Sequence, residues 1–151
     1  MQHDALQLTS EKNHEAIDAR SWIPIHDSPQ LRMTWDAVVR VPPQYMAIMS
    51  AAGNPRVKSP DGVYRFDMPL PVPAYLIGLA VADLEFREID ARSGVYAAPH
   101  VADAAARELA VVPAMMRAAE SIVGPYRWER YDLAIMPPSY HVGGMEHARL
   151  T

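Results

Sequence analysis

The chain has 151 residues, of which 50% are hydrophobic and 21% are charged, with a formal net charge of -4 and no cysteine. This composition is typical of a globular chain and excludes a collagen, a disulfide scaffold and intrinsic disorder. A negative net charge provides no basic field for a phosphate backbone, so we expect no nucleic-acid partner. The sequence shows no signal peptide, and its longest apolar stretch, residues 72–82, is too short to span a bilayer. We therefore expect a cytoplasmic protein without a membrane partner.

The first half of the chain has the patterns of β-strands. Apolar and polar side chains alternate over residues 31–41, which predicts a half-buried antiparallel strand. A second strand is predicted over residues 45–50. Residues 59–62 have the turn sequence Ser-Pro-Asp-Gly, and the strand predicted after it, over residues 63–68, would return antiparallel to the residues before it.

Proline and glycine divide the rest of the chain. The apolar run 74–89 follows prolines at positions 69, 71 and 73, and it predicts a long central strand. From Val101 to Val123, apolar residues recur every three or four positions, which is typical of one face of a helix. Pro113 predicts a kink there or two consecutive helices, and Gly124 with Pro125 ends the helical pattern.

A short strand is predicted over residues 131–136, before a glycine-containing loop that begins at Pro137. The order of strands, then helix, then strand predicts an α+β chain. The change of pattern after residue 90 indicates that a β domain covers residues 1–90 and that a different α/β domain begins at residue 91. Residues 91–151 would be only the start of that second domain.

The histidines do not form a metal site that the sequence can support. His14 and Glu15 begin a run that imitates the zinc motif H-E-x-x-H, but Asp18 occupies the place of the second histidine. His141 and His147 are six positions apart across two glycines, so they cannot be a helical ligand pair. We therefore predict that no metal is bound by motifs of this chain.

The segment Gly143-Gly144-Met145-Glu146 is a better candidate for chemistry. Two glycines allow the backbone to approach a ligand closely, and the carboxylate that follows would lie at the same ligand. The alternative, a loop that simply exposes an acidic side chain, remains open on composition alone.

Several runs of the sequence resemble the zinc aminopeptidases of the gluzincin clan, especially their leukotriene hydrolase branch. The runs are residues 15–17, 19–24, 27–29, 71–77, 124–133, 136–139 and 143–146. They follow one another in unbroken order over roughly residues 13–151. The resemblance implies an α+β chain that joins the end of an antiparallel β-saddle domain, over residues 1–90, to the start of a thermolysin-like α/β catalytic domain, over residues 91–151.

The resemblance also implies roles for individual residues. In the family, the glutamate of a G-x-M-E-N loop receives the free α-amino group of a peptide, and the glycine backbone aligns that peptide. The matching residues are Gly143, Gly144, Met145 and Glu146. Glu15 matches a second residue that holds the same amine, and Asn13 matches a residue that lines the first side-chain pocket.

Two positions depart from the family, since His147 replaces an asparagine and Val142 replaces a tyrosine of the branch. In the family, the zinc-binding helix and the catalytic tyrosine follow the matched region. We therefore expect a parent zinc aminopeptidase that removes the N-terminal residue from peptides, and a chain that is inactive alone. Its expected partners are a peptide with a free N-terminus and the remainder of the catalytic domain. The alternative is a non-catalytic peptide-binding or interaction module, from a truncated or degenerate paralogue.

Overall fold

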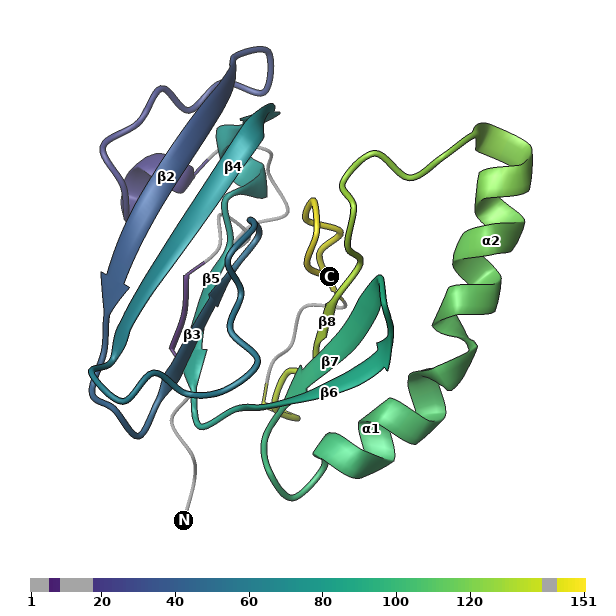
Figure 1. Cartoon of the computed structure of the whole chain (residues 1–151). Coiled ribbons are helices and arrows are strands. Elements are labelled where there is room, and N and C mark those ends of the chain that lie inside the picture. Colours follow the sequence, from purple (N-terminus) through teal and green to yellow (C-terminus); the bar gives the residue numbers. More distant parts are fainter. Residues whose placement is uncertain (1–5, 9–17, 140–143) are drawn as a thin grey trace.

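Figure 1 shows the computed structural model of the chain, which describes residues 6–8, 18–139 and 144–151. The strands are β1 (Leu6–Leu8), β2 (Arg32–Arg40), β3 (Met46–Met49), β4 (Val63–Pro73), β5 (Leu79–Ala82), β6 (Glu85–Asp90), β7 (Ser93–Ala97) and β8 (Leu133–Ala134). The helices are α1 (Ala102–Glu108) and α2 (Val112–Val123), with 3-10 turns η1 (Ala19–Ser21), η2 (Ala74–Leu76) and η3 (Leu109–Val111). The predicted α+β class is confirmed, with small sheets on one side and the helices on the other.

The first predicted strand is confirmed as β2, which pairs antiparallel with β4. Trp35 lies opposite Met68 and Val39 opposite Tyr64 in this two-stranded sheet. Exposed and half-buried side chains alternate along β2, as expected for a strand that covers a core with one face. The predicted alternation therefore identifies both the strand and its inner face.

The turn before β4 is also confirmed. Gly62 has a φ of +67°, a left-handed conformation that glycine adopts without steric cost. A Cβ atom at Gly62 would lie 1.9 Å from the carbonyl oxygen of Val41, whose N–H donates to the Gly62 carbonyl at 2.9 Å. Glycine is therefore required here both for the backbone conformation and for the close approach to β2.

Strand β4 is longer than the strand predicted over residues 63–68, because it continues through Pro69, Pro71 and Pro73. Pro69, Pro71 and Pro73 occupy every second position of the strand, so their missing N–H groups all fall on one edge. Asp67 uses that same edge to bond Ala52, and β2 occupies the other. The prolines thus remove donors only where the sheet has no further strand.

The single long strand predicted over residues 74–89 is wrong. The run is divided into the turn η2, the strand β5 and the strand β6. Strand β5 lies between β1 and β3 in one sheet, whereas β6 pairs with β7 in another. An apolar run gives no signal for the point at which a chain leaves one sheet and enters the next, and here that point is the bend at Asp83 and Leu84.

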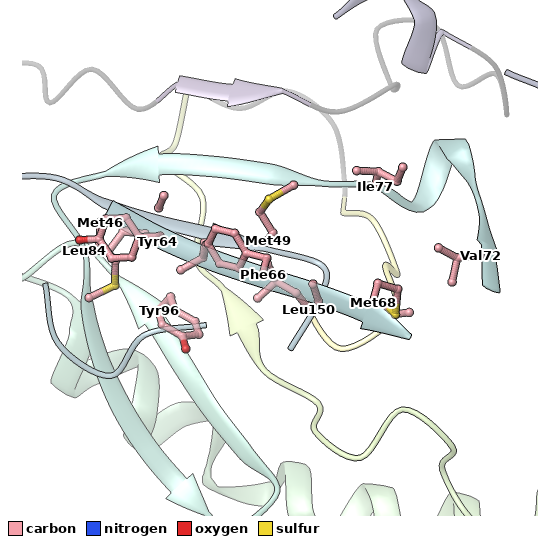
Figure 2. Packing of buried hydrophobic residues seen from close by; sticks show 14 residues of the cluster. Met46, Met49, Tyr64, Phe66, Met68, Val72, Ile77, Leu84, Tyr96 and Leu150 are labelled. Atoms are coloured by element: carbon pink, nitrogen blue, oxygen red, sulfur yellow. The ribbon is translucent and has the colours of Figure 1, made fainter. Parts of the chain in front are cut away.

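One hydrophobic core joins the first two sheets to the later part of the chain. All four residues of β3 are buried, and they pack in one cluster with Tyr64 and Phe66 of β4. Tyr96 of β7 and Leu150 near the end of the chain belong to the same cluster, as Figure 2 shows. This cluster fixes the position of the last residues of the chain relative to β3 and β4.

The helical prediction is confirmed, including its break. Two helices follow each other, and Pro113 lies in the first turn of α2. Gly124 ends α2 with a φ of +89°. Helix α1 packs on β6 and β7, whereas α2 is tied to that sheet through Glu120. The α2 helix has 12 residues, and no helix of the described part of the chain is long and apolar enough to cross a membrane.

Strand β8 is shorter than the predicted strand over residues 131–136 but lies within it. It runs parallel to β7, so the two helices form a crossover between parallel neighbours. Strands β6 and β7 form a hairpin whose turn lies at residues 91–92, where the second domain was expected to begin. The division into two domains at this point stays a prediction.

Candidate functional site

The candidate loop ends in a segment that is fixed beside β8. Its last residues, 147–150, are buried, and Leu150 reaches the core. The N–H of Asp132 donates to the Arg149 carbonyl at 3.0 Å, and the N–H of Thr151 donates to the Asp132 carbonyl at 2.9 Å. The N–H of Ala134 donates to the Thr151 carbonyl at 2.7 Å. These bonds extend the β7–β8 sheet by one more parallel segment.

Exposure changes sharply along this segment. Gly144 and Glu146 are exposed and Met145 is half-buried, whereas His147 is only 7% exposed. The Glu146 carboxylate therefore projects toward solvent from a backbone that is anchored immediately after it. No ion-pair partner of Glu146 lies among residues 6–8, 18–139 and 144–151.

Arg149 connects the end of the candidate loop to the segment that follows α2. Its φ of +72° is left-handed, and its N–H donates to the hydroxyl oxygen of Tyr126 at 3.3 Å. Its side chain is 8% exposed and forms an ion pair with Glu129 at 3.1 Å, and Glu129 also has a left-handed φ, of +66°. Left-handed backbone at non-glycine residues persists only where surrounding contacts hold it. The segment after Gly124 thus constrains the end of the candidate loop.

His147 packs its ring against Gly78, at the beginning of β5. A Cβ atom at Gly78 would lie 2.9 Å from Nε2 of His147 and about as close to its two neighbouring ring carbons. Neither ring nitrogen has a hydrogen-bond partner in the described part of the chain. Burial lowers the pKa of the imidazole to about 4, while the Leu76 carbonyl and the Glu146 carboxylate act in the opposite direction. His147 is therefore neutral near pH 7.

Gly78 and its neighbours belong to a buried hydrogen-bonded turn. The Ser50 hydroxyl donates to the Leu76 carbonyl at 2.6 Å and accepts the N–H of Gly78 at 2.9 Å. The N–H of Ser50 donates to the Gly78 carbonyl at 3.2 Å, and Ser50 is fully buried. This network joins the end of β3 to the turn before β5. The surface on which His147 rests is accordingly rigid.

The structure describes half of the predicted site residues. Gly144, Met145 and Glu146 lie in the anchored segment beside β8. Asn13, Glu15, Val142 and Gly143 lie outside the described residues, so their predicted places beside Glu146 stay predictions. The sequence did not identify His147 or Arg149 as buried supports of the loop. One signal was present, since a glycine inside an apolar run, here Gly78, often marks a close approach of another group.

The zinc ion that the resemblance implies does not fit the described residues. No group of three or more His, Cys, Asp or Glu side chains that could hold a metal occurs among them. Glu146 has no second ligand near it there, and His147 turns its buried ring toward Gly78. Residues 6–8, 18–139 and 144–151 therefore supply no zinc site.

A second concave feature lies along α2. A hollow of about 660 Å³ is bounded by the helix and by the segment that follows it. Its lining is mostly apolar and includes Leu109, Met115, Met116, Val123, Tyr126 and Trp128. Met115 and Val123 remain 61% and 82% exposed. The described residues therefore leave this face of α2 exposed.

Known proteins match this chain over almost its whole length. Rat aminopeptidase B is 41% identical over 138 residues, which is 91% of this chain and 21% of that protein. Leukotriene A-4 hydrolase of Xenopus laevis is 37% identical over 141 residues, which is 91% of this chain and 23% of that protein. The chain thus spans about a fifth of the length of these relatives. No family model matches it.

Solved structures give the same result for the fold. Native yeast leukotriene A4 hydrolase superposes with a TM-score of 0.85 and 31% identity over 97% of this chain and 22% of that one. An M1 zinc metallopeptidase from Deinococcus radiodurans, at 24% identity, superposes with a TM-score of 0.67 over 97% of this chain and 34% of that one, which shows the shared fold alone. The matches thus define a class, the metallopeptidases. Within that class, the chain belongs to the M1 aminopeptidase and leukotriene A4 hydrolase family.

Proposed function

We propose that the whole protein is a zinc-dependent aminopeptidase that hydrolyses the N-terminal residue from peptides, and that this chain carries its amine-anchoring loop. The observation that carries the proposal is the exposed carboxylate of Glu146, which forms no ion pair with another described residue, on a segment anchored by His147. The names of the 37–41% identical relatives support the reaction class. In this proposal, the chain joins the end of a β-saddle domain to the start of a thermolysin-like catalytic domain, near residue 90.

Electrostatics favours an ammonium ligand at this position. A carboxylate about 4 Å from an ammonium contributes about 4 kcal/mol of gross Coulomb attraction at an effective dielectric near 20, before desolvation. In the proposal, Glu15 is the second anchor of the amine, Gly143, Gly144 and Met145 align the peptide, and Asn13 lines the first side-chain pocket. Anchoring the terminal amine would leave no room for residues before it, which is the requirement for an exopeptidase.

The zinc and the rest of the catalytic domain are assigned to polypeptide other than the described residues. When bound, zinc in such sites activates a water molecule and polarises the scissile carbonyl. The exposed face of α2 supports this assignment, because a hollow lined by apolar side chains is suited to burial against further protein. We therefore propose that the chain of 151 residues does not hydrolyse peptides alone.

The role of Glu146 is tested by Glu146→Gln in the whole protein, with affinity measured for matched ligands that carry a free or an acetylated N-terminus. We expect a loss of about 10- to 100-fold for the free amine only, since hydrogen bonds to charged groups contribute about 1.5–3 kcal/mol. Glu108→Gln, at an exposed position at the end of α1, is the matched control and should change neither affinity. Equal losses on both ligands in Glu146→Gln would remove Glu146 from this role.

The second test measures release of p-nitroaniline from an aminoacyl-p-nitroanilide. The chain of 151 residues supplied with zinc should show no turnover above background, and the whole protein should show zinc-dependent turnover. Turnover by the short chain would overturn its assignment as inactive. No turnover by either protein, combined with selective binding of free-amine peptides, would instead favour a non-catalytic peptide-binding module.

A further inference from the structure

We propose that His147 is the positioning residue of the candidate loop: its ring, packed on Gly78, holds the backbone that presents Glu146. The inference rests on the proposed role of Glu146 as the amine anchor. Nothing in the matched proteins' names assigns a task to this position.

The contact is close and specific. A Cβ atom at Gly78 would lie 2.9 Å from Nε2 of His147, 3.1 Å from Cδ2 and 3.2 Å from Cε1, and these are its three nearest neighbours. The ring therefore lies so close to the Gly78 backbone that a side chain at this position would force the ring to shift. Gly78 does not have a left-handed φ, so this glycine is required by the neighbour and not by its own backbone.

The surface under the ring is fixed by the buried Ser50 hydroxyl, which bonds both Leu76 and Gly78. The residue that follows Glu146 is therefore held between this turn on one side and the β8 edge, through Arg149 and Asp132, on the other. Glu146 itself makes no such contact with residues 6–8, 18–139 or 144–151 and is exposed. Displacement of the His147 ring would consequently move the Glu146 backbone without removing any bond of Glu146.

The ring also leaves the Glu146 charge free. A protonated imidazole in the next position would compete with a ligand ammonium for the same carboxylate. Among the described charged groups, Glu146 is the one whose charge acts on the ring, and the ring also lies against Gly78 and near the Leu76 carbonyl. Burial against these uncharged groups keeps the ring neutral.

The contact between the His147 ring and Gly78 is tested in the full chain by Gly78→Ala, which adds one methyl group against the ring. We expect the His147 Cε1–H resonance, assigned by its absence in His147→Gln, to titrate near pH 4 in the unmodified chain. In Gly78→Ala, the midpoint should rise by at least about one pH unit, because the displaced ring gains solvent. If His147 titrates near its ordinary value of 6.5 in the unmodified chain, the packing of the ring on Gly78 is overturned. An unchanged midpoint in a folded Gly78→Ala chain overturns it as well.

Gly94→Ala is the matched control, because a Cβ atom there would also strike a ring, that of Phe86 at 2.3 Å, in the β6–β7 hairpin. It should lower stability without changing the His147 titration. If Gly78→Ala does not fold, His147→Ala removes the same contact without a clash. The double variant Gly78→Ala/His147→Ala, in which the added methyl has no ring to strike, then shows whether the clash is the cause.

The positioning role is tested in the whole protein by the ratio of affinities for free-amine and N-acetylated ligands. Gly78→Ala and His147→Ala should each lower this ratio on the order of tenfold, since a misplacement of about 1 Å can cost up to about 100-fold. Their combination should lose no more than either alone, because both disrupt one contact. His147→Gln, neutral and similar in length, should recover most of the ratio, and Gly94→Ala should leave it unchanged.

The outcomes separate this inference from the proposed function. If Glu146→Gln does not affect free-amine binding, the proposed anchor is wrong, and the positioning role is overturned with it. The titration of His147 still shows in that case whether its ring packs on Gly78. If Glu146→Gln is selective but neither Gly78→Ala nor His147→Ala changes the ratio, the anchor stands and the positioning role alone is overturned.

Discussion

The core around β3 and the helix α2 use apolar residues in opposite ways. All four residues of β3 are buried, whereas α2 buries only Val112 among its 12 residues. The core forms from contacts between β3, β4, β7 and the end of the chain, all of which the chain itself supplies. Among the described residues, the apolar face of α2 borders a hollow that it shares with its flanking segments and with Leu133 of β8. Apolar periodicity thus identifies a face that can be buried, but not whether the chain contains its partner.

Polar contacts hold α2 instead. Both oxygens of Glu120 accept hydrogen bonds from the Arg92 guanidinium, at 2.7 and 3.1 Å, and one of them also accepts the N–H of Tyr126 at 2.9 Å. These bonds, with Arg92 the larger cause, lower the pKa of Glu120 to about 2. An ion pair with 40% and 21% exposed side chains contributes far less stability than a packed core. The two regions should therefore respond very differently to the same substitution.

The largest effect is expected for Met68→Ala, because Met68 is fully buried in the core (Figure 2). Removal of a buried methionine side chain leaves a cavity and costs about 2–5 kcal/mol of unfolding free energy. Met115→Ala is the matched control on α2, where the side chain is 61% exposed and the cost should stay within about 0.5 kcal/mol. Urea unfolding measures both values. Similar losses would show that α2 is covered in solution and would contradict the difference in burial between α2 and the core around β3.

The second effect is a dependence of stability on pH that arises from His147. Its pKa is about 4 in the folded chain and about 6.5 when unfolded, so the unfolded chain binds the proton more tightly. The contribution of neutral His147 to the free energy of unfolding should be fully present above pH 6.5. The free energy of unfolding should fall by roughly 3 kcal/mol as the pH decreases from 6.5 through 4. Urea midpoints between pH 7 and 4 test this expectation. His147→Gln should remove this part of the dependence, and an unchanged slope in that variant would assign it to other groups.

Local sequence signals predicted the elements whose structure depends on local rules. The alternation of β2, the turn at Gly62 and the helix break at Pro113 follow from side-chain period or backbone geometry alone. The course of β4 through its prolines could not be predicted in this way, because it depends on which edge of the strand is unpaired. The division of residues 74–89 into η2, β5 and β6 depends likewise on how the sheets are arranged.

The candidate site shows the same limit. Glu146 was predicted through the resemblance of its loop, and its role stays a prediction, although the side chain is exposed. The burial of His147 and Arg149 could not be read from the sequence, since it results from contacts with Gly78 and Tyr126, which are 69 and 23 positions away. A motif can thus indicate a candidate side chain, but it cannot indicate the residues that hold that side chain, because these are defined by tertiary contacts.

A smaller effect is expected for Tyr64→Phe in the core. The Tyr64 hydroxyl accepts the N–H of Ser59 at 2.9 Å and donates to the Tyr45 carbonyl at 2.9 Å. The substitution keeps the packed ring and leaves these two groups unpaired, so it should cost about 1–2 kcal/mol. Urea unfolding measures the loss. No measurable loss in Tyr64→Phe would show that water replaces the hydroxyl at the edge of the core.

The smallest change in stability, within about 0.5 kcal/mol, is expected for Met115→Gln, since glutamine and methionine have similar helix propensities and the site is exposed. The same substitution should nevertheless lower the fluorescence of a hydrophobic dye bound to the native chain, because Met115 lines the hollow beside α2. Ile122→Gln is the matched control, since Ile122 is 83% exposed but does not line the hollow, and its effect on the dye should be smaller. Equal dye losses in the two variants would mean that the dye reports general apolar exposure. They would contradict the expectation that the dye binds in the hollow beside α2.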